Sequence, residues 1–578
     1  MPRNQEWILR RRTPDDFIRE HPELDPVVAR ILYARKFDST ERIRDFLSTE
    51  GTIQAPWLLA GMSDAVERIE RAIAEGERIA VYGDFDVDGV TATVLLTSIL
   101  QNLGARVLSF IPDRFEDGYG LNSDALDRLQ AQGITLCITV DCGIRSVDEV
   151  DYAQLRGVDM IVTDHHSLPE TLPRAYAVVN PRRPDSSYAF TELTGVGVAF
   201  QLARALRERL AGAPPDSGPD TYTDQYLDLV ALGTIADVAP LEGENRTLVR
   251  WGLNRLRSAP RPGLVELAAL AGIELATLDS TDVAFRIAPR LNAAGRIENA
   301  TIASQLLMAP DARVAGPLAK QLDEINRDRQ QLLEAQVSQA RDMVDAADLP
   351  SILFIEGPDY HEGIVGLVAS RLREHYYRPV LVLRSGEGTA RGSARSVEGF
   401  HITRALESCR DILIRFGGHA QAAGFTLETA RVPEMHARLL DYADQHLNEH
   451  DLVPRLLVDA IVSLNDLSED TPRAISVLGP FGQGNPEPVL ATLGARVMDV
   501  RRIGSGGKHL RLDISQDGTP RTCVAFRQGD AADWIGNGDR IDLVYRPSLN
   551  RWQGRESLQL VVEALRPHGA ARAVPGVE

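Results

Sequence analysis

Three carboxylates stand at alternate positions, Asp84, Asp86 and Asp88, directly after the apolar run 79–82 and just before Gly89. Carboxylates this close together repel one another, and each would be driven toward protonation unless a cation shared the site. A divalent metal ion removes that conflict. The spacing therefore predicts a metal site immediately after a buried strand.

A calcium-binding EF-hand loop shares the same D-x-D-x-D-G opening and is the first alternative. That loop needs a glutamate at its twelfth position and a helix before it. Here the twelfth position is Leu95, and the preceding residues 79–82 have the character of a strand. The pattern disfavours an EF-hand.

Further polar groups follow other predicted strands. Asp141 follows the run 138–140, Asp164, His165 and His166 follow 160–163, and Asp237 ends a helical segment. A lone aspartate after a strand is more often a helix cap, but groups at several parallel strand ends meet at one edge of a sheet. Oxygen ligands with one imidazole favour Mn²⁺ or Mg²⁺ over zinc, and two such ions activate water for attack on phosphorus. Because neighbours in an extended chain point to opposite sides, one histidine should bind metal and the other should face substrate or a carboxylate.

The elements around these residues alternate between strands and helices. The predicted strands are 78–82, 106–111, 136–140, 158–163 and 175–179, and the predicted helices are 122–132, 146–156, 197–210 and 224–236. This rhythm is typical of an α/β fold with a doubly wound, mainly parallel sheet.

The 578 residues are too many for one core and predict several domains. We expect a catalytic domain with an N-terminal extension, a long connecting helix without Gly or Pro at 318–349, a second α/β domain, a small β-barrel and a disordered tail. Their predicted ranges are 1–310, 311–349, 350–454, 455–567 and 568–578.

Composition narrows the class of protein. No apolar run reaches the roughly 18 residues of a membrane span, residues 1–12 lack the apolar core of a signal peptide, and four scattered cysteines predict reduced thiols in a cytoplasmic protein. The net charge of −19 argues against a large nonspecific DNA surface, although residues 455–578 balance 15 basic against 15 acidic side chains. Arginine greatly outnumbers lysine. A role in phosphate binding would produce this excess, and so would a GC-rich genome.

Four segments resemble the motifs of the DHH phosphoesterase superfamily: Y-G-D-F-D-V-D-G (82–89), T-V-D-C-G-I (139–144), T-D-H-H (163–166) and G-T-I-A-D-V-A-P-L (233–241). Segments along the rest of the chain resemble the RecJ family of that superfamily, namely 112–120, 289–296, 361–366, 392–396, 417–425 and 481–486. The resemblance implies a bacterial 5′→3′ exonuclease specific for single-stranded DNA in repair and recombination. It also implies that the second domain is DHH-associated and that the barrel is of the oligonucleotide-binding (OB) kind.

The same resemblance implies two Mn²⁺ or Mg²⁺ ions. Asp84 and Asp141 would hold one, and Asp86, Asp141, His165 and Asp237 the other, with Asp141 as the bridge. His166 would stabilise the transition state or protonate the leaving oxygen, whereas Asp88 and Asp164 would support the ligands. Tyr82 stands where some relatives have a histidine ligand, which would leave the first metal with fewer ligands.

A 5′-end exonuclease needs a socket for the terminal phosphate, and arginine fits it through two parallel hydrogen bonds. Taken alone, each arginine would more often make a surface ion pair. The predicted substrate-binding residues are Arg114, Arg290, Asn292, Arg296, His361, Ser393, Arg395, Gly418 and His419. In the barrel, basic and aromatic groups should hold the strand, namely Arg501, Arg502, Lys508, Arg511, Tyr545, Arg551, Trp552 and Arg555.

The expected partner is single-stranded DNA, and the resemblance adds a single-strand-binding protein, a helicase and a monomeric state. Two alternatives stay open. A DHH phosphodiesterase of short oligoribonucleotides or cyclic dinucleotides would not need the long helix or the barrel. A catalytically inactive DHH scaffold in a replication complex would not need intact carboxylates at 84, 86, 141 and 237.

Overall fold

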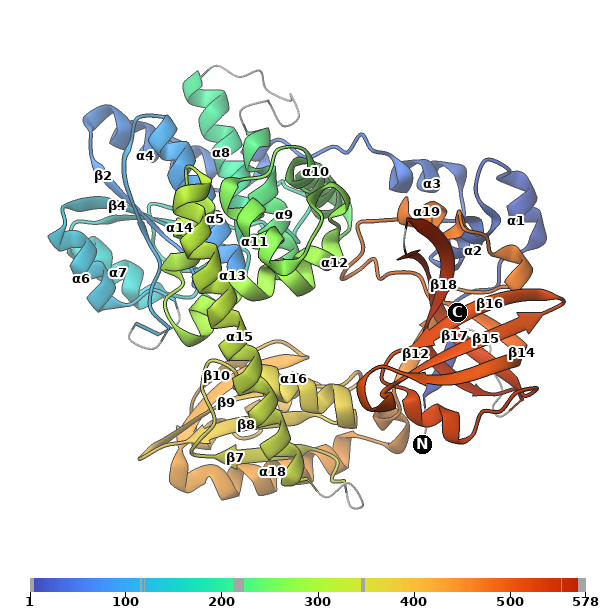
Figure 1. Ribbon diagram of the computed structural model, residues 1–578. Helices are drawn as coiled ribbons and strands as arrows, with labels where there is room; N and C mark the ends of the chain where they lie inside the picture. Colours follow the sequence, from blue (N-terminus) through green and yellow to red (C-terminus); the bar gives the residue numbers. More distant parts are fainter. Residues whose placement is uncertain are drawn as a thin grey trace. The chain divides into compact units, whose positions relative to one another are not determined.

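The computed structural model describes residues 5–114, 117–118, 120–211, 223–344, 349–552 and 554–569, without the side chains at 211, 551 and 552. The chain forms two compact units (Figure 1). The first, here the catalytic unit, comprises Thr49–Ser338 and Pro480–Pro486. The second comprises Met1–Ser48, Gln339–Gly479 and Glu487–Glu578. No described helix is long and apolar enough to cross a membrane.

A five-stranded sheet with only parallel pairings lies at the centre of the catalytic unit. Its strands are β2 (Arg78–Tyr82), β3 (Arg106–Phe110), β4 (Ile134–Val140), β5 (Asp159–Thr163) and β6 (Ala177–Val179). Their order in space is β3-β2-β4-β5-β6. The chain therefore reverses its direction across the sheet between β2 and β4, the point where open α/β sheets bind ligands. The predicted doubly wound parallel sheet is confirmed.

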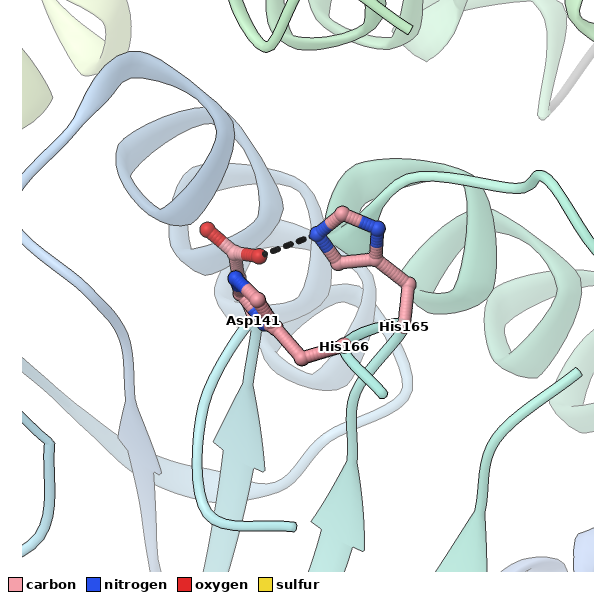
Figure 2. Close-up of side chains that lie close together, drawn as sticks. All are labelled: Asp141, His165 and His166. Atoms are coloured by element: carbon pink, nitrogen blue, oxygen red, sulfur yellow. Dashed lines mark ion pairs between the residues drawn. The ribbon is translucent and has the colours of Figure 1, made fainter. Parts of the chain in front are cut away.

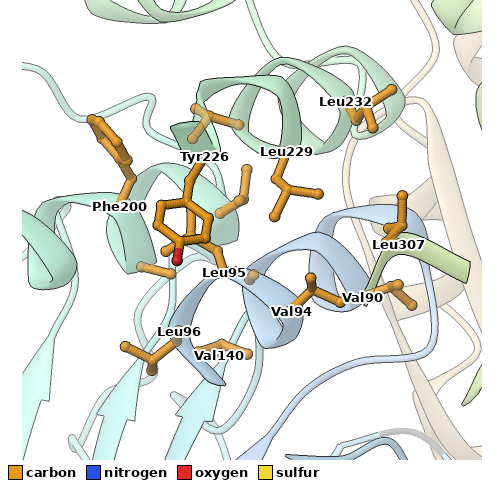
Figure 3. Packing of buried hydrophobic residues seen from close by; sticks show 14 of the residues in the cluster. Val90, Val94, Leu95, Leu96, Val140, Phe200, Tyr226, Leu229, Leu232 and Leu307 are labelled. Atoms are coloured by element: carbon orange, nitrogen blue, oxygen red, sulfur yellow. The ribbon is translucent and has the colours of Figure 1, made fainter. Parts of the chain in front are cut away.

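Helices cover both faces of this sheet because its strands are apolar on both sides. On β2, Ile79 and Val81 join one apolar cluster, whereas Ala80 and Tyr82 join another. The first cluster contains α4 (Met62–Glu75), α5 (Val87–Asn102) and α8 (Gly195–Ala211), and the second contains α6 (Ser123–Ala131) and α7 (Val147–Leu155). Figure 3 shows the packing around α5, which is buried along nearly its whole length.

The remaining helices of this unit pack on the α5 side of the sheet. They are η1 (Pro56–Leu58), η2 (Asp224–Tyr226), α9 (Leu227–Ala236), α10 (Gly243–Ser258), α11 (Pro262–Ala271), η3 (Leu275–Thr277), α12 (Ser280–Asp282), η4 (Val283–Ile287), α13 (Ala288–Ile297) and α14 (Thr301–Met308). Every residue from Leu227 to Ile235 of α9 is buried. This burial fixes the position of α9 and therefore that of Asp237, the residue directly after its end.

The long helix α15 spans Ala312–Asp342 and thus differs from the predicted 318–349 at both ends. It begins earlier, with Gly316 and Pro317 inside its first two turns. A proline near a helix start removes a single intrahelical hydrogen bond, so the run without Gly or Pro marked the middle of the helix. Residues 345–348 lie outside the described residues.

The N-terminal extension belongs to the second unit and not, as predicted, to the domain 1–310. It contains β1 (Glu6–Leu9), α1 (Asp15–Glu20), α2 (Pro26–Ala34) and α3 (Thr40–Leu47). Strand β1 pairs in parallel with β12 (Arg455–Val458), and Arg35 Nε lies 2.8 Å from Asp459 Oδ1 in a buried ion pair. These contacts join residues more than 400 positions apart, so no local pattern could predict them.

The second α/β domain contains a mixed sheet in the order β10-β11-β9-β8-β7. Only β7 and β8 are parallel. Its elements are β7 (Leu353–Gly357), α16 (Val365–Tyr376), β8 (Val380–Ser385), β9 (Thr389–Arg395), α17 (Ile402–Glu407), η5 (Arg410–Ile412), β10 (Leu413–Gly418), β11 (Ala422–Glu428), η6 (Thr429–Arg431), α18 (Val432–His446) and η7 (Glu449–Leu452).

The C-terminal domain is a closed barrel, as predicted, because β14 pairs with β17 as well as with β15. Its elements are β13 (Ala460–Ile461), η8 (Leu464–Asp466), α19 (Thr471–Ser476), β14 (Leu490–Ile503), η9 (Ser505–Gly507), β15 (His509–Gln516), β16 (Thr519–Ala525), η10 (Gly529–Asp533), β17 (Arg540–Trp552) and β18 (Arg555–Pro567).

Two expectations for the barrel were wrong. Tyr545, predicted to stack on bases, is fully buried, and its hydroxyl lies 2.7 Å from Thr492 Oγ1. It is a core residue. The predicted disordered tail begins too early, because His568 Nδ1 lies 2.6 Å from Asp542 Oδ1. Residues 570–578 lie outside the described residues, as do the side chains of Arg551 and Trp552.

Candidate metal centre and substrate-binding residues

The carboxyl ends of the catalytic strands bring the predicted acidic residues together. Three groups have ligand atoms within 4.8 Å of one another: Asp84, Asp86 and Asp141; Asp141, His165 and His166; and Asp88, His165 and Asp237. The first two groups share Asp141, and the last two share His165. By these distances Asp86 lies with Asp84, whereas the sequence placed it with His165 and Asp237.

Asp141 is at the centre of the site. It directly follows β4, at the reversal point of the sheet, and its φ of 62° puts it in the left-handed region that non-glycine residues seldom adopt. Its Oδ1 lies 3.1 Å from Nε2 of His165. Figure 2 marks this ion pair with a dashed line. A Cβ added at Gly195 would lie 2.4 Å from Asp141 Cβ. Only glycine at the start of α8 leaves room for this carboxylate.

Burial and mutual repulsion shift the titration of the cluster. Burial, followed by the charge of Asp86, raises the pKa of Asp84 to about 8. Burial, followed by the charge of Asp88, raises the pKa of Asp237 to about 8 and lifts that of Asp141 well above its usual range. Carboxylates in this state cannot all ionise at neutral pH without added positive charge. The donor set of carboxylate oxygens with one facing imidazole nitrogen fits Mn²⁺ or Mg²⁺.

Asp86 and Asp88 also hold the backbone. Asp86 is the N-cap of α5, and its Oδ1 accepts hydrogen bonds from the N–H groups of Asp88 and Gly89. The two carboxylate oxygens of Asp88 accept from the N–H groups of Gly195 and Val196, at 2.7 and 3.0 Å. Asp88 thus fixes the start of α8 beside Asp141, a geometry that suits the supporting role predicted for it.

The rings of His165 and His166 have different carboxylate neighbours, but they lie on the same side of the chain. His165 faces Asp141, whereas His166 Nδ1 lies 2.7 Å from Asp164 Oδ1. Their ring centroids are only 4.5 Å apart, so the expectation of opposite sides was wrong. The chain bends after β5 because Asp164 Oδ1 also accepts from the N–H groups of both histidines. Burial alone would lower the pKa of His166, but the hydrogen bond and charge of Asp164 raise it to about 9.

Two supporting residues were missed in the sequence. Asn180 Nδ2 donates to His166 O at 3.0 Å, and Arg182 Nε donates to His165 O at 2.9 Å. Both follow β6, the next strand of the sheet. The same strand-end rule that identified Asp141 would have found them, had Asn and Arg been included with the acidic residues.

Tyr82 contributes no ligand to the cluster. Its ring is fully buried on the α6 and α7 side of the sheet, and its hydroxyl donates to Gly120 O at 3.0 Å. Burial raises the pKa of this phenol. The side chain fills the core beneath the site.

The predicted substrate-binding residues of the catalytic unit differ from one another in what they contact. Arg114 stacks on Phe85, with its guanidinium carbon 4.1 Å from the ring centroid. Burial lowers the pKa of Arg114, although the negative charges of Asp84 and Asp86 act in the opposite direction. Asn292 Oδ1 accepts from Val87 N at 3.1 Å, so this side chain supports the start of α5. Arg290 differs from the expectation of a phosphate ligand, because its Nε donates to Asp323 at 2.9 Å and its Nη1 donates to a backbone carbonyl. Arg296 is half-buried near the end of α13.

The predicted residues of the second unit gather in two places. An added Cβ at Gly366, in the first turn of α16, would lie 2.8 Å from Arg395 Nη2 and 3.2 Å from Ser393 Oγ, so these two side chains of β9 meet a helix start. Burial lowers the pKa of Arg395.

His361 stands just before that helix, and its Nδ1 accepts from Gly363 N. Gly418, with φ of 149°, and His419 form the exposed turn between β10 and β11. The turn needs glycine because a Cβ at Gly418 would lie 2.3 Å from Ala422 O.

Known families match most of the chain. The N-terminal domain of the DHH family matches residues 78–234, the DHHA1 domain matches 349–449, and the RecJ OB domain matches 458–564. The chain is 35% identical to the single-stranded-DNA-specific exonuclease RecJ of Escherichia coli, over 97% of this chain and 100% of that protein. The chain belongs to the RecJ family.

Other members agree. RecJ of Bacillus subtilis is 40% identical over 96% of this chain and 70% of that protein. The crystal structure of Thermus thermophilus RecJ in complex with Mn²⁺ superposes with a TM-score of 0.83 at 33% identity, over 98% of this chain and 80% of that one. A structure of that RecJ with Mg²⁺ matches with a TM-score of 0.77. The resemblance inferred from the motifs is confirmed.

Proposed function

We propose that this RecJ-family protein is a metal-dependent exonuclease that degrades single-stranded DNA in repair and recombination, 5′→3′, to 5′-mononucleotides. The observation that carries the proposal is the buried carboxylate cluster at the reversal point of the catalytic sheet. A scaffold without activity would have no reason to keep such a cluster, since each buried carboxylate destabilises the fold unless it is compensated.

The proposed metal ligands are Asp84, Asp86, Asp141, His165 and Asp237, with Asp141 between two sites. Two Mn²⁺ or Mg²⁺ ions bound there would activate water and neutralise charge on the scissile phosphate. Asp88 and Asp164 are not proposed as ligands, because both carboxylate oxygens of each accept backbone hydrogen bonds. In Asp84 and Asp86 the backbone hydrogen bonds from the described residues go to Oδ1, which leaves Oδ2 for a metal ion.

His166 is proposed to act on the leaving group. Its Nδ1 is fixed by Asp164, whose hydrogen bond and charge raise the pKa of the ring and favour its protonated form. The Nε2–H can then be given to the 3′ oxygen as the bond from that oxygen to phosphorus breaks. Arg114 lies on the Asp84 and Asp86 side and is proposed to contact a phosphate oxygen, with Phe85 holding its guanidinium flat.

The second unit is proposed to bind the strand. Ser393 and Arg395 at the start of α16 offer a hydroxyl, a guanidinium and a helix N-terminus to a phosphate group. His361, Gly418 and His419 would complete that socket, and Arg296 would add a contact in the catalytic unit. The exposed basic groups of the barrel, Arg501, Arg502, Lys508, Arg511 and Arg555, would hold the strand beyond it.

We also propose that the protein works as a monomer in the cytoplasm, where it would meet chromosomal DNA, alongside a helicase and a single-strand-binding protein. Size-exclusion chromatography with light scattering tests the oligomeric state, and pull-down with each purified protein tests the partners.

End-labelled oligonucleotides, single- and double-stranded, test the activity with Mn²⁺ or Mg²⁺. A 5′ label should be released at once as a mononucleotide from single strands and only slowly from duplex. Faster turnover of a dinucleotide than of a long strand would favour the alternative phosphodiesterase. Absence of Mn²⁺ binding by calorimetry would favour the inactive scaffold.

A further inference from the structure

One segment of the catalytic unit comes from far along the chain. Residues 480–486, here called the clasp, lie between α19 and β14 in sequence yet belong to the unit of residues 49–338. The clasp is a closed turn, because Gly482 N donates to Asn485 O and Asn485 Nδ2 donates to Pro480 O, both at 2.9 Å.

Hydrogen bonds among the described residues attach the clasp to the rest of the unit. Leu241 N donates to Gln483 O at 2.8 Å, and Ser280 Oγ donates to Phe481 O at 2.6 Å. Both attached residues, Leu241 and Ser280, are buried. The clasp therefore supplies the acceptors for two donors on buried residues, and a buried donor left without an acceptor destabilises the fold.

The two glycines of the clasp lie directly against residues 241 and 242. A Cβ at Gly482 would lie 2.7 Å from Leu241 Cδ1, and a Cβ at Gly484 would lie 3.0 Å from Glu242 Oε1. Gly484 also has φ of 76°, which favours glycine. A side chain at Gly482 would therefore displace the buried Leu241 side chain, and one at Gly484 would strain the backbone.

The surface that the clasp covers is the end of the loop that begins at Asp237. The first residue of this loop is held by α9, since Asp237 N donates to Gly233 O, whereas Leu241 anchors the far end in the core. Between them Val238 is 65% exposed and has φ of 59°, a rare conformation for a β-branched residue. The Asp237 side chain is itself 28% exposed, against 2% for Asp141. Inside the loop, Ala239 N donates to Thr234 O at 3.4 Å and Asn245 Nδ2 donates to Pro240 O at 3.1 Å, so the clasp adds to contacts from within the unit.

We infer that the clasp is a positioning element for Asp237: by fixing Leu241 it holds the strained loop that carries this carboxylate toward His165, 3.9 Å away. This inference rests on the proposed function, because it assumes that Asp237 is a metal ligand. It assigns to a C-terminal segment a role in the affinity of the catalytic unit for metal.

The test compares clasp variants with matched controls in the full-length protein. Ser280→Ala removes one attachment without adding atoms; its control, Ser304→Ala, removes a buried serine whose Oγ donates within its own helix, to Thr301 O. Gly484→Ala strains the clasp; its control, Gly518→Ala, has φ of 85° but open space around the added methyl group. Supporting residues around metal ligands typically change affinity 10–100-fold.

Calorimetric titration with Mn²⁺ should show about tenfold weaker binding for Gly484→Ala and a smaller loss for Ser280→Ala, with both controls unchanged. Saturating Mn²⁺ should restore the turnover of both clasp variants. Unchanged Mn²⁺ affinity in the clasp variants, with only a lower melting temperature, would overturn the inference and leave the proposed function intact. Absence of Mn²⁺ binding in the unmodified protein would overturn both.

Discussion

The catalytic cluster and the β10–β11 turn of the predicted phosphate socket were both identified from sequence motifs, yet one is buried and the other is exposed. The cluster is buried; Asp84 and Asp141 are 3% and 2% exposed, and Asp86 and Asp88 accept backbone hydrogen bonds. The turn at Gly418 and His419 is exposed. The fold itself positions the proposed metal ligands in advance, whereas part of the predicted socket lies on an exposed turn.

The largest expected effect is on metal binding and turnover, which should depend on the catalytic cluster. Asp141→Asn should remove the central ligand and lower kcat at least about 10³-fold, beyond the loss for a single stabilising group, because this carboxylate belongs to two of the three ligand groups. Mn²⁺ calorimetry and single-strand degradation would measure it. Asp148→Asn, at an exposed residue of α7, is the control and should change neither. Wild-type turnover in Asp141→Asn would remove the metal centre from the mechanism.

The next effect concerns proton transfer within the cluster. His166→Ala should lower kcat about 10²-fold or more while leaving Mn²⁺ affinity within a few-fold, since general acids contribute about 10²–10⁴. His446, exposed and bonded to a carbonyl of its own helix, provides the control as His446→Ala. A loss in kcat smaller than about tenfold would contradict the proposed role.

A smaller effect is expected at the predicted phosphate socket. A substitution there should change KM and leave metal binding unchanged. Arg395→Ala should raise KM about tenfold for a 5′-phosphorylated strand and far less for a 5′-hydroxyl strand, because a hydrogen bond to a charged group contributes about 1.5–3 kcal/mol. Arg438→Ala removes an exposed arginine ion-paired on α18 and serves as the control. Equal losses on both substrates would argue against a phosphate socket there.

The smallest effect is on stability. The pKa values of Asp84 and Asp237, about 8 when folded, exceed the unfolded value near 3.9. The folded state therefore binds more protons, and stability present below about pH 4 is lost as pH rises through about 8. Each such group costs about 1.4 kcal/mol per pH unit between its unfolded and folded pKa, so the melting temperature of metal-free protein should fall between pH 6 and 8.5. Mn²⁺ should raise the melting temperature more at pH 8.5.

Differential scanning fluorimetry with and without Mn²⁺ measures this dependence, with Asp141→Asn as the variant that should lose the Mn²⁺ increment. An increment in melting temperature that is larger at pH 6 would contradict the sign derived from the cluster.

Much of the site followed from sequence because its signals are local. Each ligand stands next to an apolar strand or helix end, so the run before Asp84 or Asp141 predicted both the element and the edge where it ends. The positions of Arg290 and Tyr545 could not be predicted this way, since an ion pair with Asp323 and a hydrogen bond to Thr492 depend on residues distant in the chain.

The sequence by itself determined the residue types, the α/β rhythm and the family motifs, because periodicity and strand-end chemistry are written in neighbouring residues. Only the tertiary structure decided that Asp86 groups with Asp84 and Asp141, that residues 6–9 pair with 455–458, and that residues 480–486 contact Leu241. These outcomes depend on which distant backbone donors and acceptors meet. The local sequence determines which polar groups need a hydrogen-bonding partner, whereas tertiary packing determines which residue that partner is.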